Sequence, residues 1–264
     1  MNIIARQLGV VLDGHHILQD LHFTLSEGLT GVIGPNGAGK STLVQSLAGI
    51  LPHSGHLEFC AEGMERSTRQ PRGLSTSKLG YLPQTPLPES GLTVLEAVLL
   101  GLVGELGLRV TAEQLERVDA QLAVLEIKQL AERRLSTLSG GQRQLVALAQ
   151  CLVRDPKLLL LDEPLNNLDL HHQLEILDIV QAWTRQTRAS TLAVLHDLSL
   201  AARYCDRLLL ISQGKLKAFG LPEEVLTPSR LREEFYLEGA LVRDRKGRLH
   251  LEGCDLYRPV SMAA

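Results

Sequence analysis

Apolar residues recur with two different periods in this chain, and the period changes along the sequence. Apolar and polar positions alternate over Asn2–Val11 and Ile17–Leu25, which predicts two strands joined at Asp13-Gly14 in an antiparallel hairpin. Further short apolar runs predict strands over Leu29–Ile33, Gly55–Cys60, Leu79–Leu82, Lys157–Leu161, Thr191–Leu195, Arg207–Ile211 and Leu216–Phe219. The run Leu158–Leu161 is continuously apolar, as expected of a strand that is buried on both faces of a parallel sheet.

Helical periodicity dominates the middle of the chain. Patterns typical of helices cover Thr93–Leu102, Thr111–Ile127 and Gly140–Val153, with little strand signal between them. Thr93 is followed three residues later by Glu96, the spacing of a capping box. We therefore expect residues 85–154 to form an inserted helical subdomain. Later helices are predicted over Leu170–Gln186, Leu198–Tyr204, Pro222–Leu226 and Arg230–Phe235.

The order of these elements predicts an α/β fold. Strands that alternate with helices indicate a mostly parallel sheet, to which the N-terminal hairpin adds an antiparallel β part. Residues 67–77 are polar and basic, so we expect a connector there. After residue 238 the pattern is weak, with Lys246-Gly247 predicting a turn between the apolar runs 241–242 and 249–251. Residues 260–264 are expected to fray.

Composition and charge limit the classes of function. The chain has 264 residues, a formal net charge of −3 and a sequence pI near 6.3, which argues against a general nucleic-acid binder. No apolar run approaches the ~18–20 residues that span a bilayer. The N-terminus lacks a basic segment followed by an apolar core, so no secretory peptide is expected. The four cysteines are widely scattered, which disfavours a disulfide framework or a metal site. These features favour a soluble, cytosolic protein.

The strongest chemical signal lies between a predicted strand and a predicted helix. Residues 34–42 read G-x-x-x-x-G-K-S-T, the pattern of a phosphate-binding loop. Glycines let backbone N–H groups approach an anion closely, and a helix starting near Gly39 would point its positive dipole end at the same phosphates. Lys40 would reach the outer phosphates, and the Ser41 hydroxyl would bind Mg²⁺. The candidate residues are Gly34, Pro35, Asn36, Gly37, Ala38, Gly39, Lys40, Ser41 and Thr42.

Two acidic residues follow the most apolar strand. Asp162 and Glu163 come directly after Leu158–Leu161, and strand C-termini line the ligand crevice of an open parallel sheet. We expect Asp162 to hold Mg²⁺, directly or through water, and Glu163 to polarise the attacking water. A strand that merely ends in solvent is the alternative, which the phosphate-binding loop makes less attractive.

A second glycine-rich helix start lies at Ser139, Gly140, Gly141 and Gln142. Ser139 can cap the helix, and the two glycines leave N–H groups accessible to an anion. One triphosphate needs only one such cradle within a chain, so the second one suggests a nucleotide held by another copy. An ordinary Ser-capped helix fits the local sequence equally well.

The stretch Leu-Ser-Gly-Gly-Gln lies between the phosphate loop and Leu158–Glu163. With these three motifs in this order, the chain resembles the ATPase subunit of ABC transporters over residues 2–235. The resemblance implies a P-loop NTPase (RecA-like) core and specific roles. Residues 34–42 resemble the Walker A loop, Asp162 the Walker B aspartate and Glu163 the catalytic base. Further roles implied are Gln84 as the Q-loop contact to Mg²⁺, Ser139–Gln142 as the signature that closes over ATP on the opposite subunit, Asp169 in a D-loop at residues 166–169, and His196 as the switch histidine.

The sequence departs from the family pattern in two places. The aromatic residue that usually stacks on adenine corresponds to Leu12, so packing on the base would fall to Leu12 or Ile17. The D-loop reads Asn-Asn-Leu-Asp where Ser-Ala-Leu-Asp is usual, but Asp169 is kept, and its contact across the dimer is expected to survive.

The resemblance also implies a mode of action. We expect one ABC ATPase domain: 1–84 and 155–238 as catalytic core, 85–154 as helical subdomain with the signature, and 239–264 as a C-terminal appendage. The expected assembly is a homodimer that hydrolyses ATP with Mg²⁺ and powers a transmembrane permease on the inner face of the cell membrane, indirectly serving a substrate-binding protein and binding no nucleic acid. Stretches 168–175, 195–204 and 220–227 are similar to importers of ferric siderophores, haem and cobalamin, with siderophore import as the leading expectation.

Other functions remain open at the level of sequence. A P-loop phosphotransferase would lack the signature, whereas an iron–sulfur assembly ATPase, an exporter or another metal importer would keep it. His171-His172 invites a metal interpretation, but neighbouring ligands are missing and the pair is expected at an exposed helix start.

Overall fold

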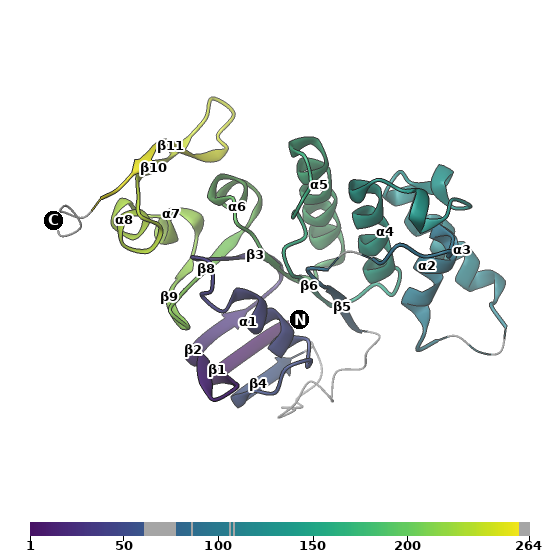
Figure 1. Cartoon of the computed structure of the whole chain (residues 1–264), viewed down its shortest axis with the longest axis horizontal. Helices are drawn as coiled ribbons and strands as arrows, with labels where there is room; N and C mark the ends of the chain where they lie inside the picture. Colours follow the sequence, from purple (N-terminus) through teal and green to yellow (C-terminus); the bar gives the residue numbers. More distant parts are fainter. Residues whose placement is uncertain (61–77, 86, 106, 108, 259–264) are drawn as a thin grey trace.

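The computed structural model describes residues 1–60, 78–85, 87–105, 107 and 109–258. A six-stranded sheet in the order β5-β6-β7-β3-β8-β9 lies at its centre (Figure 1). All neighbouring strands in it pair in parallel except β9, which is antiparallel to β8. Its strands are β3 (Gly28–Ile33), β5 (Leu79–Leu82), β6 (Leu158–Leu161), β7 (Ser190–Val194), β8 (Arg207–Ser212) and β9 (Lys215–Gly220).

A three-stranded antiparallel sheet faces one side of the central sheet. It has the order β2-β1-β4, from β1 (Asn2–Leu12), β2 (His15–Leu25) and β4 (Ser54–Cys60). Helix α1 (Lys40–Leu47) lies beside it. The apolar positions of both sheets and of α1 form one core, to which β6 contributes Leu158 and Leu160. The predicted N-terminal hairpin is confirmed. Strand β4, which follows α1 in the chain, pairs with β1 and adds a third strand to it.

Helices cover the opposite face of the central sheet. Leu159 and Leu161 of β6 point into this second core, as the two-residue period of a strand requires. Figure 1 shows α4, α5 and α6 over this face, with α2 and α3 beyond them. The helices are α2 (Val94–Leu99), α3 (Ala112–Val124), α4 (Gly140–Leu152), α5 (Leu170–Thr187), α6 (Leu198–Tyr204), α7 (Pro222–Val225) and α8 (Pro228–Phe235), with 3₁₀ turns over Leu100–Leu102, Lys128–Leu130 and Leu135–Thr137.

The expected α/β architecture with an antiparallel β part and a helical region is therefore confirmed. The predicted capping box of Thr93 and Glu96 is present at the start of α2. Two predicted helices were too long. The α-helical hydrogen bonds of α2 give way to a 3₁₀ turn after Leu99, and α3 ends at Val124 before a left-handed Glu126.

The C-terminal region forms a second antiparallel hairpin. Strands β10 (Leu237–Arg243) and β11 (Leu249–Leu256) are longer than the short apolar runs that predicted them, and the turn includes Gly247 as expected. The hairpin contacts α6, where the backbone N–H of Leu251 donates to the Ser199 hydroxyl at 3.1 Å. The expected connector at 67–77 and the fraying end at 260–264 lie outside the described residues. Among the described residues, no helix combines the length and apolar character needed to cross a bilayer.

Candidate nucleotide site

The loop between β3 and α1 is shaped by left-handed glycines. Gly34 has φ 148°, and a Cβ there would lie 1.9 Å from the carbonyl oxygen of Ile211, so no side chain fits. Gly39, at φ 98°, immediately precedes the helix. The Lys40 ammonium donates to the carbonyl oxygens of Gly34 at 2.8 Å and Pro35 at 2.9 Å. Burial lowers the pKa of Lys40, while the carboxylates of Glu163 and Asp162 oppose that shift.

Asp162 lies at the end of β6, fully buried below this loop. Its Oδ1 accepts a hydrogen bond from the Ser41 hydroxyl at 2.7 Å, whereas its Oδ2 is buried without a hydrogen-bond partner. Burial raises the pKa of Asp162, and the Ser41 hydrogen bond only partly opposes this. A buried carboxylate oxygen without a partner, beside a hydroxyl and a phosphate loop, fits the oxygen-donor set that Mg²⁺ takes with a nucleotide. The two residues therefore suit the predicted metal role.

Glu163 is surrounded by three hydrogen-bond donors. Its Oε2 accepts from the Gln84 side-chain amide at 2.7 Å and from the Asn166 side-chain amide, and its Oε1 lies 2.9 Å from His196 Nε2. Partial burial alone would raise the pKa of Glu163, but His196, Asn166 and Gln84 together outweigh it and the pKa is lowered. Glu163 is thus a carboxylate at neutral pH. Its φ of 53° turns the chain so that Asn166 returns to it.

Residues 36–42 of the loop, together with Glu163 and His196, open on one cavity of about 310 Å³. Its lining comprises Ile17, Asn36, Gly37, Ala38, Gly39, Lys40, Ser41, Thr42, Glu163 and His196. Ile17 and Leu12 both pack against the core between the two sheets, but of the two only Ile17 lines the cavity and is available to a base. Sequence reasoning assigned Asn166 only to the D-loop and missed its bond to Glu163, for which the sequence holds no signal beyond the spacing of three residues.

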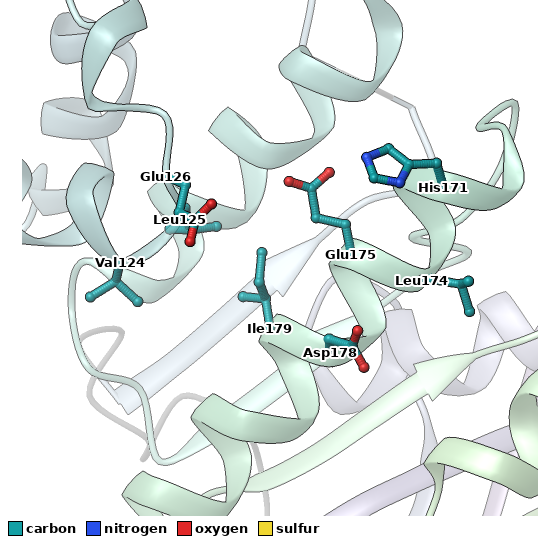
Figure 2. Close-up of a pocket in the computed structure, with 8 residues that line it drawn as sticks. All are labelled: Val124, Leu125, Glu126, His171, Leu174, Glu175, Asp178 and Ile179. Carbon is teal, nitrogen blue, oxygen red and sulfur yellow. The ribbon is translucent and has the colours of Figure 1, made fainter.

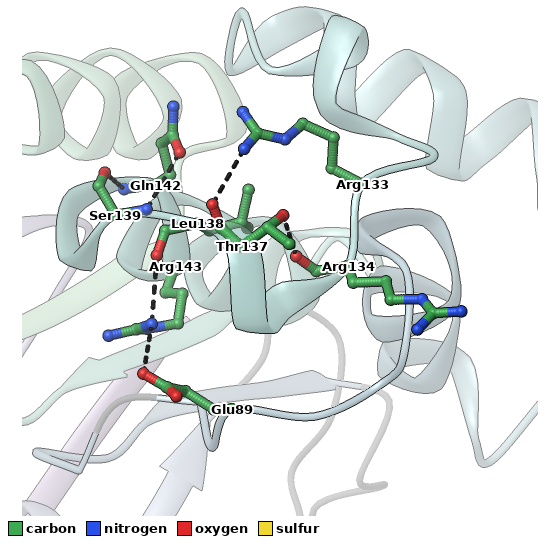
Figure 3. A network of polar contacts seen from close by, with 8 residues as sticks. All are labelled: Glu89, Arg133, Arg134, Thr137, Leu138, Ser139, Gln142 and Arg143. Carbon is green, nitrogen blue, oxygen red and sulfur yellow. Dashed lines mark hydrogen bonds and ion pairs between the residues drawn. The ribbon is translucent and has the colours of Figure 1, made fainter.

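The signature stretch (residues 139–142) lines none of this cavity. Ser139 caps α4 in a full capping box: its hydroxyl accepts from the Gln142 N–H at 3.2 Å, and its own N–H donates to the Gln142 side chain at 3.1 Å. Figure 3 shows Arg143, next along, bridging the Leu138 carbonyl and Glu89. Asp169 likewise caps α5 and is absent from the cavity lining. One chain therefore brings together the loop, Asp162, Glu163, Gln84 and His196, but not the signature.

The comparisons with known proteins decide the family. The family model described as ABC transporter matches residues 18–166, more than half of the chain. The chain belongs to the ABC transporter family. It is an ABC ATPase, and its domain implies ATP binding.

Several curated relatives of this ABC ATPase are import proteins. It is 38% identical over 248 residues to the hemin import ATP-binding protein of Bordetella pertussis, covering 90% of this chain and 93% of that one. It is 34% identical over 247 residues to the iron(3+)-hydroxamate import ATP-binding protein of Bacillus subtilis, covering 92% and 91%. It is 35% identical over 237 residues to the cobalamin import ATP-binding protein of Halobacterium salinarum. That match covers 89% of this chain, but the chain spans only 59% of the length of this relative.

Solved structures agree with the fold of this ABC ATPase. One chain of an inward-facing metal-chelate-type ABC transporter superposes with a TM-score of 0.81 at 26% identity, covering 95% of this chain and 96% of that one. An ATP-binding cassette in its ADP conformation gives a TM-score of 0.76 at 25% identity, covering 88% and 98%.

Proposed function

We propose that two copies of this chain hydrolyse ATP as a head-to-tail pair and thereby power import through a separate membrane permease. The observation that carries the proposal is the composition of the cavity. It holds the phosphate loop, Glu163 and His196, but no residue of the signature stretch. The second anion cradle at Gly140 and Gly141 is then completed only by the nucleotide of another copy.

The chemistry assigned to each side chain follows from its surroundings. Lys40, held at the loop carbonyls, moves its charge to the outer phosphates of ATP. Glu163, ionised and oriented by Gln84 and His196, accepts the proton of the attacking water. Ser41, Asp162 and Gln84 are proposed to hold Mg²⁺, which supplies positive charge to the phosphates. Loss of the γ-phosphate then removes the contacts that close the pair.

The proposed division of the chain gives each part a task. Residues 1–84 and 155–238 form the catalytic core, 85–154 the helical subdomain, and 239–264 an appendage. Gln84 lies in the segment between core and helical subdomain, and its side-chain amide donates to Glu163. A movement of this segment would therefore change the hydrogen bonding and orientation of the proposed base, Glu163. We infer that the permease contacts this segment at the cytoplasmic face of the membrane, that a substrate-binding protein delivers the cargo to the permease, and that no nucleic acid is involved.

The proposed cargo is a metal chelate, with a ferric siderophore as the first candidate. The relatives named above import hemin, iron(3+)-hydroxamate and cobalamin, all of which are metal chelates. Haem and cobalamin are the alternatives within this class. An ATPase of another ABC system, such as iron–sulfur assembly, is the alternative outside it. Co-purification with a membrane permease would separate a transport ATPase from an iron–sulfur assembly ATPase.

Uptake by living cells tests the proposal. Cells lacking this chain receive the native form or Lys40→Ala, and uptake of labelled ferric hydroxamate, haem and cobalamin is measured in parallel. Rescue of one cargo by the native form alone supports ATP-driven import of that cargo. Unchanged uptake of all three after deletion, in cells without a redundant system, contradicts import of this class.

A further inference from the structure

The adjacent histidines at the start of α5 meet edge-on, with ring centroids 5.5 Å apart, but they have different surroundings. Figure 2 shows His171 beside a cavity of about 560 Å³ between α5 and the end of α3, which Glu126 and Glu175 also line. His172 instead lies against the start of α4. Within the described residues, no group of three or more His, Cys, Asp or Glu side chains is arranged to hold a metal ion. The role of His172 is therefore sought in its contacts with protein.

His172 contacts the D-loop stretch (residues 166–169) on one side. Its ring Nδ1 lies 2.8 Å from Asp169 Oδ1, and its backbone N–H donates to the same oxygen at 2.9 Å. The hydrogen bonds of the ring and of the helix N-cap thus converge on one carboxylate oxygen. They also lower the pKa of Asp169, so this carboxylate is ionised at neutral pH. His172 consequently fixes the last residue of the D-loop stretch.

His172 contacts the signature stretch on its other side. A Cβ on Gly141 would lie 2.5 Å from the ring Cδ2, 2.8 Å from Cγ and 2.9 Å from Nε2. Real Cβ atoms essentially never come closer than 3.0 Å to such atoms. The ring therefore occupies the space that every residue other than glycine would fill at position 141. This contact links two segments that are far apart in the sequence.

A hydrogen bond also joins α4 to the chain just before the D-loop stretch. The side-chain amide of Gln144, one turn after Gly141 on α4, donates to the Pro164 carbonyl oxygen at 2.9 Å, and Gln144 is buried. Gln173, next to His172, donates to the Leu168 carbonyl at 3.1 Å. The start of α4 and the chain leading into α5 are thus joined at two points, of which His172 is the one that touches the signature stretch itself.

We propose that His172 is a positioning residue that holds the signature stretch and the D-loop stretch in one fixed relation. The inference rests on the proposed function, in which both stretches meet a second copy. Two surfaces that already have their mutual geometry lose less conformational freedom on association. Displacement of a phosphate-binding group by about 1 Å costs on the order of 100-fold in rate. His172 therefore acts on closure of the pair, not on the first binding of ATP.

Two substitutions separate the two contacts of His172. His172→Phe keeps a ring beside Gly141 but lacks the Nδ1 donor to Asp169. His172→Asn keeps a donor near the position of Nδ1 but lacks the ring. His171→Ala is the matched control for the neighbouring ring. The His171 ring meets the His172 ring edge-on, with centroids 5.5 Å apart, but it lines the other cavity and makes no hydrogen bond to Asp169 among the described residues.

The test compares binding, turnover and dimerisation in the full chain. For His172→Phe and His172→Asn we expect ATP affinity of the single chain to change less than about twofold, since the residue lies outside the cavity that binds phosphate. We expect kcat to fall about tenfold or more. In a Glu163→Gln background, the protein concentration for half-maximal ATP-dependent dimerisation should rise about fivefold or more, whereas His171→Ala leaves it unchanged. Thermal melting confirms that each variant is folded.

The outcomes distinguish this inference from the function on which it rests. If Glu163→Gln dimerises with ATP and Mg²⁺, and both His172 substitutions leave kcat and dimerisation unchanged, the positioning role is wrong and the proposed function stands. If both substitutions weaken ATP binding by the single chain as strongly as they lower kcat, His172 acts on the cavity and the positioning role is again wrong. If Glu163→Gln alone fails to dimerise, the proposed function fails and this inference fails with it.

Discussion

The phosphate-loop cavity and the signature region differ in how completely one chain assembles them. In the cavity, residues from four separate segments already contact one another through side chains: Ser41 bonds to Asp162, and Gln84 and His196 bond to Glu163. The side chains of the signature residues Ser139 and Gln142 each bond to the backbone of the other within one helix turn. The difference teaches that a single chain orders the groups around the phosphate loop, whereas the proposed second anion cradle lies outside that cavity. Disruption of the two regions should therefore have different effects on binding and on turnover.

The largest effect is expected for Lys40→Ala. It removes a cation from the phosphate loop, and a hydrogen bond to a charged group contributes roughly 1.5–3 kcal/mol, so ATP affinity should fall about 10- to 100-fold. Isothermal titration calorimetry measures this directly. Lys157→Ala, which removes an exposed lysine paired with Asp155 at 3.7 Å, is the control. Equal ATP affinity in the native chain and in Lys40→Ala would mean that the loop does not bind the phosphates of ATP.

Asp162→Asn should show how much the buried, ionised carboxylate of Asp162 lowers the stability of the fold when no cation is bound. Because burial raises the pKa of Asp162, the folded chain binds its proton more tightly than the unfolded chain, and this residue destabilises the fold as pH rises through the raised pKa. At pH 7 without nucleotide, Asp162→Asn should melt a few degrees higher, by about 2–4 °C. The difference should disappear as pH falls below the ordinary value of 3.8. Added ATP and Mg²⁺ should stabilise the native chain more than the variant. A lower melting temperature for the variant at pH 7 would contradict this account.

Ser139→Ala should separate turnover from binding on the signature side. Loss of the N-cap costs about 1 kcal/mol, and ATP hydrolysis should fall while ATP affinity of the single chain stays the same. Thr111→Ala is a matched control, because Thr111 caps α3 in the same kind of box with Gln114. Both variants should lose similar stability in urea unfolding, but only Ser139→Ala should lose ATPase activity. Equal losses of ATPase activity in Ser139→Ala and Thr111→Ala would mean that Ser139 acts only as a helix cap.

The smallest effect is expected where the segment after Gln84 meets the signature helix. Glu89→Gln breaks the ion pair with Arg143 at 3.1 Å. Because Glu89 is exposed, the loss of stability should stay below about 1 kcal/mol, with ATP affinity unchanged. Glu238→Gln, which breaks the exposed pair with Arg232, is the control for a pair far from the signature. A larger loss for Glu89→Gln in urea unfolding would mean that this link stabilises the helical region.

Local patterns predicted most of the architecture and many of the residues that line the cavity. The phosphate loop, the acids after β6 and the capping box at Thr93 each depend on residues within about nine positions of one another, so the sequence displays them directly. The C-terminal hairpin was predicted only in part, because its strands are half-exposed and lack strong alternation. Local apolar pattern is a weak guide where a strand places only a few of its side chains against the core, as Leu249 does here.

Contacts that depend on an unusual backbone conformation or on the packing of distant segments could not be predicted. Asn166 reaches Glu163 because Glu163 adopts a left-handed conformation, which residue type alone does not announce for a glutamate. The contact of His172 with Gly141 depends on how α4 and α5 pack. The pairing of β4 with β1 likewise depends on the tertiary fold. In each case the sequence around one residue gives no indication of which other residue it contacts.

Association of Glu163→Gln with ATP and Mg²⁺ tests the central claim most directly. This variant keeps the cavity and the signature stretch but lacks the carboxylate that accepts the proton, so the closed pair should accumulate. Sedimentation velocity should show the 29.0 kDa chain shifting to twice that mass with ATP and Mg²⁺, and returning to a single chain with ADP. A variant that binds ATP yet stays at 29.0 kDa at high protein concentration would contradict the claim that two copies complete the site.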